Sequence, residues 1–170
     1  MPIPLNAMWK ISLHEITLTE TAHLGSWARL TATWNGHELG YLDSVDQNDG
    51  SILLSDVFVH PTVRVKVGVF GWLIRRVHPK WKFLYPRCSG VGESLVKRFL
   101  DSCQQRGLNE VFGNVTFHCI QTCPFLEKWY RSLGFQIGPP DGRAEFGPIA
   151  FKIIRSFLPD RSSEAVPPIS

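Results

Sequence analysis

The chain has 170 residues and a net charge of +3, with 44% hydrophobic and 19% charged residues. These values are typical of one globular, soluble domain with a sizeable core. No apolar run approaches the roughly 18 residues that cross a bilayer, which excludes a membrane-spanning helix. The net charge is too small to identify a nucleic-acid-binding protein by itself.

The N-terminal stretch and the cysteines indicate the cellular compartment in which the protein is expected. The N-terminal stretch MPIPLNAMWKIS lacks the charged and then apolar layout of a secretory signal. Four cysteines (Cys88, Cys103, Cys119 and Cys123) show no metal-ligand spacing. We therefore expect reduced thiols in a cytoplasmic protein, and no metal site.

The first half of the chain reads as strands. Residues 9–19 alternate apolar and polar side chains, and residues 28–34 and 38–45 flank the hairpin dipeptide Asn35-Gly36. A turn is expected at 47–50. Residues 52–60 then form an apolar run typical of a deeply buried strand, which Pro61 closes.

The second half alternates helices and strands. Apolar residues at helical spacing predict a helix over 90–106 that ends at Gly107: Val91, Leu95, Val96, Phe99, Leu100 and Cys103. A strand over 108–118, a short helix over 124–135 and a last strand over 150–157 follow. Residues 158–170 read as a disordered tail. This order predicts an α/β fold with a hairpin-rich front end.

Residues 62–86 do not fit this order and read as an insertion. Seven Lys or Arg residues and no acidic residue lie between positions 57 and 92, and six of the seven belong to the insertion. We expect an anionic ligand or partner to meet the protein there.

Two glycines and an arginine precede the predicted helix, in the run RCSGVG of residues 87–92. The first turn of a helix exposes unpaired N–H groups, and Gly90 and Gly92 would let a phosphate approach them closely. Arg87 would add a charged donor. A glycine pair alone fits an ordinary structural turn equally well.

Four motifs in order resemble the GNAT superfamily of acyl-CoA-dependent N-acetyltransferases. Residues 87–92 resemble its Arg/Gln-x-x-Gly-x-Gly/Ala signature, and residues 56–61 (DVFVHP) look like its central strand. A helix of about four turns leads into a strand, and residues 125–135 are similar to its Tyr-x-x-Leu-Gly-Phe helix. The resemblance implies one domain over 1–157, with a mixed, mostly antiparallel sheet of six to seven strands flanked by helices.

The same resemblance implies acetyl-CoA as co-substrate. It would lie in a V-shaped split between the strands at 52–60 and 108–118, with its pantetheine along the first strand and its pyrophosphate on the glycine-bearing turn. The residues implied in binding are Val57, Phe58, Val59, Arg87, Cys88, Ser89, Gly90, Val91, Gly92 and Cys123.

The catalytic residues also follow from the resemblance. Tyr130 matches the tyrosine that protonates the departing thiolate, although it also fits an ordinary core aromatic. For the base, the position twelve residues earlier is His118, which is equally suited to a structural role at a strand end. Asp56 is the second candidate and His60 the third. A chain of ordered water could replace all three.

The sequence departs from the superfamily pattern in ways that concern the acceptor. Cys123 stands where an asparagine is common, and about eight residues replace two helices that usually wall the acceptor site. The insertion at 62–86 could rebuild that wall or act as a lid, or be a solvated basic loop. Its basic and aromatic residues suit nucleic acid, and equally an acidic protein surface or the 3′-phosphate of the co-substrate. The last strand could pair in a homodimer.

Two functions therefore remain open. The first is an N-acetyltransferase that acts on an amine of unknown identity by direct transfer. The second is a catalytically silent module that binds a partner through the insertion. An unrelated nucleotide-binding protein would need a phosphate-binding lysine or ribose-binding acid at known spacing, and the sequence contains neither.

Overall fold

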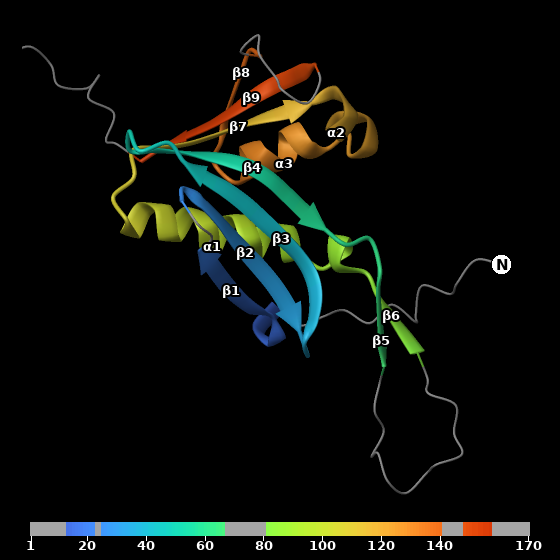
Figure 1. The fold of residues 1–170 in the computed structure, drawn as a ribbon. Helices are drawn as coiled ribbons and strands as arrows, with labels where there is room; N and C mark the ends of the chain where they lie inside the picture. The colour runs from blue at the N-terminus through green and yellow to red at the C-terminus, as the bar shows by residue number, and fades with distance from the viewer. Residues whose placement is uncertain (1–12, 23–24, 67–80, 141–147, 158–170) are drawn as a thin grey trace, which may run out of the picture.

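The computed structural model describes residues 13–22, 25–66, 81–140 and 148–157. These residues form a seven-stranded sheet and a separate two-stranded one (Figure 1). In the large sheet the order is β1 (Thr17–Ala22), β2 (Trp27–Trp34), β3 (His37–Asp46), β4 (Ser51–Val59), β7 (Glu110–Thr116), β9 (Ile149–Ser156) and β8 (Gln136–Gly138). All neighbours are antiparallel except β4 and β7. The predicted α/β class with a mixed, mostly antiparallel sheet is confirmed.

The front hairpin is confirmed, but the first strand is shorter than predicted. Asn35 and Gly36 have positive φ angles of 48° and 76°, as a tight hairpin turn requires. β1 begins at Thr17, after a 3₁₀ turn at Leu13–Glu15. The alternation changes phase between Leu13 and Ile16, so a single strand would put these side chains on opposite faces. Residues 9–12 of the predicted strand lie outside the described residues.

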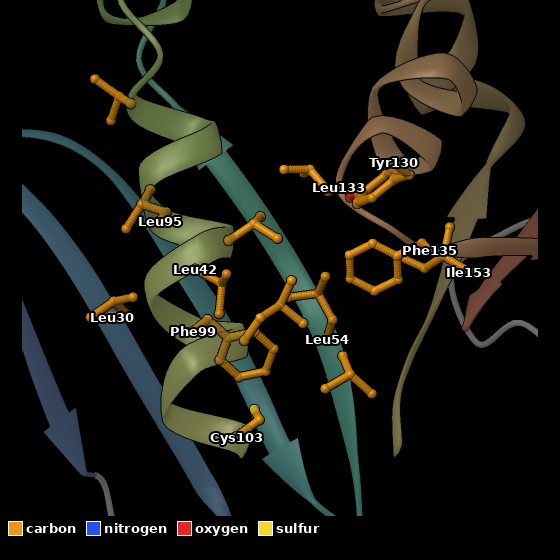
Figure 2. Packing of buried hydrophobic residues seen from close by; sticks show 14 of the residues in the cluster. Leu30, Leu42, Leu54, Leu95, Phe99, Cys103, Tyr130, Leu133, Phe135 and Ile153 are labelled. Atoms are coloured by element: carbon orange, nitrogen blue, oxygen red, sulfur yellow. The ribbon is translucent and has the colours of Figure 1, made fainter. Parts of the chain in front are cut away.

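One long helix covers the half of the sheet formed by β2, β3 and β4. This helix, α1 (Val91–Gln105), buries all six predicted apolar residues, and Gly107 follows it in the left-handed conformation. Figure 2 shows Leu95, Phe99 and Cys103 of α1 directed toward Leu30, Leu42 and Leu54 of the sheet. Burial of these side chains holds α1 against the sheet.

The segment after β7 differs from the prediction. The expected strand over 108–118 ends at Thr116, whose hydroxyl accepts a hydrogen bond from the backbone N–H of Cys119 and so caps a short helix, α2 (Phe117–Thr122). The predicted helix over 124–135 is shorter, α3 (Leu126–Ser132), and ends before Gly134, which has a φ of 83°. The three-residue β8 was not predicted.

The ends of the insertion form a ribbon of β5 (Val63–Lys66) and β6 (Trp81–Leu84), followed by the 3₁₀ turn η3 (Pro86–Cys88). Residues 67–80 and the tail at 158–170 lie outside the described residues, so the lid and the disordered tail stay predictions. Across the described ranges, no helix is long and apolar enough to span a membrane.

Candidate active site

The two parallel strands at the centre of the sheet separate soon after they pair. β4 and β7 are in register only from Ser51 to Leu53, opposite Glu110 to Phe112. At the point where the two strands separate, here called the branch, Gly113 of β7 lies very close to β4. A Cβ on Gly113 would be only 2.9 Å from the carbonyl oxygen of Leu54. Beyond this point the strands diverge, as the predicted V-shaped split requires, and a cavity of about 560 Å³ lies between them. This volume is within the usual range for small-molecule sites.

Seven elements contribute to the lining of this cavity: β4, β7, β9, η3, the start of α1, α2 and α3. The lining of β4 extends from Leu54 to Val59, which is about 16 Å of extended chain. Val59 lies at the end beside α1, since its carbonyl oxygen accepts a hydrogen bond from Nε of Arg87 at 3.0 Å. Leu54 lies at the other end, beside the branch. The cavity is therefore long enough for an extended ligand with two different ends.

The end beside α1 has the geometry of an anion site. Gly90 precedes the helix with a φ of 77°, which favours glycine. Gly92 is placed so that a Cβ would be 3.3 Å from Cγ2 of Val59 and 3.6 Å from Cζ2 of Trp129. Both glycines and Arg87 line the cavity, so the α1 N-terminus and the guanidinium face the same space.

The other residues of this turn have different positions. Val91 is fully buried in the core. The Ser89 hydroxyl donates to the carbonyl oxygen of Tyr85 at 3.0 Å, and the Cys88 side chain lies outside the described residues. Neither Val91 nor Ser89 is among the cavity-lining residues. Only their backbone groups could therefore contribute to an anion site.

Beyond the branch, the edge of β4 that faces away from β3 forms one wall of the cavity. The N–H of His60 bonds to the carbonyl oxygen of Leu39 on β3. Because neighbouring residues of a strand direct their backbone groups to opposite sides, those of Val57 and Val59 face the cavity. The Val59 carbonyl is occupied by Arg87, which leaves the Val57 carbonyl and the Val59 N–H for a ligand. The side chain of Phe58 stacks on the ring of Tyr41, with ring centroids 5.4 Å apart.

Tyr130 extends from α3 in the direction of β4 (Figure 2). It lines the cavity although only 7% of its surface is exposed, and its ring packs edge-on against Trp129 and Phe135. No hydrogen bond found among the described residues uses its hydroxyl. Burial raises the pKa of Tyr130 well above its usual value, and the thiol of Cys119 and the carboxylate of Asp56 raise it further. The phenol therefore stays protonated at ordinary pH and can donate a hydrogen bond into the cavity.

Asp56 lies on β4 and lines the same cavity, close enough for its charge to affect Tyr130. Its Oδ2 accepts a hydrogen bond from the Tyr41 hydroxyl at 3.3 Å. Burial raises the pKa of Asp56, and this hydrogen bond partly opposes the rise. Ser55 and Asp56 remain open to solvent where the strand leaves β7, so the cavity walls remove only part of the water around the Asp56 carboxylate, and the second half of β4 is less buried than predicted.

His118 and Cys123 also line the cavity, on its opposite wall. The prediction placed His118 at a strand end, but it lies exposed in the first turn of α2. His60 lies outside the cavity lining, with its Nε2 3.3 Å from Oε1 of Glu38. The sequence interpretation missed Cys119, Trp129 and Tyr41, and the first two line the cavity. The i, i+4 spacing of Cys119 and Cys123 could have indicated that they share a wall.

The cysteines provide a test of this geometry. Burial raises the pKa of Cys103 to about 12, whereas Cys119 is exposed and Cys123 half-buried. We expect iodoacetamide at pH 8 to label Cys119 and Cys123 in the folded protein and to leave Cys103 unmodified, because the thiolate is the reactive form. Mass spectrometry of the digested protein identifies the labelled positions. Labelling in denaturant is the control, and rapid native labelling of Cys103 would contradict its place in the core.

Comparison with known proteins identifies the fold. No family model matches the sequence, and no curated protein matches it. Among solved structures, the chain is similar to the PaiA N-acetyltransferase of Thermoplasma acidophilum in complex with coenzyme A, at 13% identity and a TM-score of 0.50 over 78% of this chain and 62% of that one. The chain thus spans less than two thirds of that protein's length.

Two further solved structures are similar to this chain. A GNAT-family acetyltransferase of Staphylococcus aureus matches at 12% identity and a TM-score of 0.53, over 79% of this chain and 70% of that one. Ard1 of Thermoplasma volcanium matches at 17% identity and the same score, over 77% and 71%. The chain therefore has the GNAT fold, as its motifs predicted.

Proposed function

We propose that this protein is an acyl-CoA-dependent N-acetyltransferase that transfers an acetyl group directly to an amine. The observation that carries the proposal is the cavity between β4 and β7, which has the glycine-bearing start of α1 and Arg87 at one end and Tyr130 and Asp56 toward the other. The PaiA neighbour, whose structure contains coenzyme A, supports the choice of co-substrate. The proposal includes a cytoplasmic location.

The residues present fit such a co-substrate. The backbone amides at the start of α1 and the guanidinium of Arg87 would hold its pyrophosphate. The Val57 carbonyl and the Val59 N–H would pair with the amides of its pantetheine, as an added strand does at a sheet edge. Cys123 can offer only a weak S–H donor where an amide side chain is common. The thioester would then lie near the branch of the sheet.

The reaction forms a C–N bond and breaks a C–S bond. Asp56 accepts the proton that the acceptor amine loses, and His118 is the alternative base on the opposite wall. We favour Asp56, because a hydrogen bond fixes its carboxylate, whereas no described contact fixes the His118 ring. Tyr130 donates a hydrogen bond to the sulfur as negative charge develops there and then transfers its proton, so that coenzyme A leaves as the thiol. The proton that Asp56 has taken up returns to the phenol through water. Alignment of the two reactants in the cavity supplies much of the remaining acceleration.

Binding of acetyl-CoA is the direct test of the proposal. Isothermal titration calorimetry should give a dissociation constant below tens of micromolar. Transfer is followed by mass spectrometry of a cell lysate incubated with isotopically labelled acetyl-CoA and the protein. No binding at that concentration would overturn the proposal and favour the silent GNAT-fold module, which binds an acidic or nucleic-acid partner through residues 62–86.

The Gly92→Val change tests the anion site. The valine side chain would occupy the space between Val59 and Trp129 and would cover the helix amides. We expect the dissociation constant for acetyl-CoA to rise at least about tenfold, which corresponds to about 1.4 kcal/mol. This loss of binding free energy is no larger than the contribution of one hydrogen bond to a charged group, which is about 1.5–3 kcal/mol.

The matched control is Gly138→Val in β8, where a Cβ meets no atom within 4 Å. Calorimetry measures the affinity of each variant, and thermal melting verifies that both are folded. Unchanged affinity in Gly92→Val would show that the diphosphate lies elsewhere.

A further inference from the structure

We propose that Tyr41 is a positioning residue whose hydroxyl holds the carboxylate of Asp56 in place at the cavity wall. The inference rests on the proposed function, because the benefit of a fixed Asp56 carboxylate is its capacity to take a proton from the acceptor amine. Tyr41 matches no part of the sequence motifs. It belongs to β3 and acts only through its neighbour on β4.

The direct contact is the hydrogen bond from the Tyr41 hydroxyl to Oδ2 of Asp56, at 3.3 Å. In the strand register Tyr41 is opposite Phe58, and Asp56 is opposite Asp43. Tyr41 and Asp56 are therefore diagonal neighbours on one face of the sheet, a distance that an aromatic side chain can span. The register shifts between Asp43 and Ser44, which leaves Ser55 as an extra residue on β4. Such a bulge changes the direction of the side chains that follow it, and here it brings the side chain of Asp56 beside the branch.

Two further contacts fix the Tyr41 ring. The Tyr41 ring stacks on the Phe58 ring. On its other neighbour strand, β2, Cζ of Arg29 lies 4.0 Å from the centroid of the Tyr41 ring. Arg29 is itself held by Asp43, whose two carboxylate oxygens accept hydrogen bonds from Nε and Nη2 at 2.7 Å each. Five side chains from three adjacent strands, those of Arg29, Tyr41, Asp43, Phe58 and Asp56, thus form one connected cluster.

The same cluster explains how Asp43 and Asp56 can face each other. Two carboxylates at opposed positions of neighbouring strands repel each other, which would favour protonation of one of them. Arg29 forms a bidentate pair with Asp43, and Tyr41 donates to Asp56. Each acid therefore has its own hydrogen-bond donor.

Several groups set the protonation of Asp56. Burial raises its pKa and Asp43 raises it too, whereas the Tyr41 hydrogen bond, the Val57 N–H and Arg29 lower it. The ionisable groups that line the cavity with Asp56 are Tyr130 from α3, His118 and Cys119 from α2, Cys123 at the end of α2, Arg87 from η3 and Glu93 at the start of α1. Of the groups that lower the pKa, the side chain of Tyr41 has the largest effect. Removal of its hydroxyl should thus move the pKa of Asp56 upward.

The test is the Tyr41→Phe variant, which keeps the ring and removes the hydroxyl. The pKa of Asp56 is measured by carboxyl ¹³C NMR titration in the native chain, in Tyr41→Phe and in the control Tyr85→Phe. Asp56→Asn assigns the resonance. We expect a higher midpoint in Tyr41→Phe only. An unchanged midpoint overturns the proposal, whatever the activity of the protein.

The second readout is the pH dependence of kcat, with acetyl-CoA and a pool of short peptides that carry free amines as the probe. The acidic limb should move to higher pH in Tyr41→Phe, while the dissociation constant for acetyl-CoA stays within twofold of native. A moved NMR midpoint with an unmoved acidic limb would overturn the catalytic role of the contact. Failure of the native chain to bind acetyl-CoA would instead overturn the proposed function, and calorimetry detects that outcome independently.

Discussion

Replacement of Tyr130 by phenylalanine is expected to lower kcat by about 10²–10⁴-fold, the usual contribution of a positioned acid or base. The variant keeps the ring that packs against Trp129 and Phe135, so the fold and the cavity should be preserved. It loses only the hydroxyl that would stabilise the departing thiolate. The dissociation constant for acetyl-CoA should therefore stay close to that of the native chain. Rates are measured as acetylated product by mass spectrometry, and affinity is measured by calorimetry.

The chain contains three tyrosines, and this allows a matched control. Tyr85 precedes η3 and is not among the residues that line the cavity. Tyr85→Phe should leave kcat within about twofold of native. Equal rates for Tyr130→Phe and the native chain would remove Tyr130 from the mechanism and leave a water chain as the proton source.

Replacement of Leu95 by alanine is expected to lower the free energy of unfolding by about 2–5 kcal/mol. Leu95 is fully buried in α1, where its side chain packs between the helix and the sheet (Figure 2). The change leaves a cavity that a core made of one continuous cluster cannot easily close. Since domains are usually stable by about 5–15 kcal/mol, this is a large fraction of the total. Urea unfolding followed by circular dichroism measures the change.

Leu13→Ala is the matched control for this prediction. Leu13 is 50% exposed in the 3₁₀ turn before β1, so its replacement should cost less than about 1 kcal/mol. A loss below 1 kcal/mol for Leu95→Ala would mean that α1 is not held to the sheet as described. The start of α1 would then be a poor platform for a phosphate.

Local patterns in the sequence determined the elements with strong periodic signals. The helix at Val91–Gln105 follows from six apolar residues at helical spacing, and the hairpin at Asn35-Gly36 follows from two residues that tolerate positive φ. The boundaries around Thr116 were wrong because a hydroxyl cap competes with continuation of the strand. The start of β1 was wrong because the alternation changes phase.

The parts of the site that lie on one continuous segment were likewise predictable. The glycine-bearing turn before α1, the strand of Asp56 and the helix of Tyr130 each carry a motif that resembles the superfamily pattern, and residues of all three line the cavity. The position of His118 on α2 was not predicted, although that residue also reaches the cavity.

The sequence by itself determined which segments fold as helices and strands and which polar residues lie on them, because these depend on neighbours a few positions apart. Only the tertiary structure decided that β4 and β7 separate after three paired positions, and that Tyr41 reaches Asp56 from another strand. Strand register, the bulge at Asp43 and side-chain packing set these contacts. They join residues that are distant in the chain, so no local pattern encodes them.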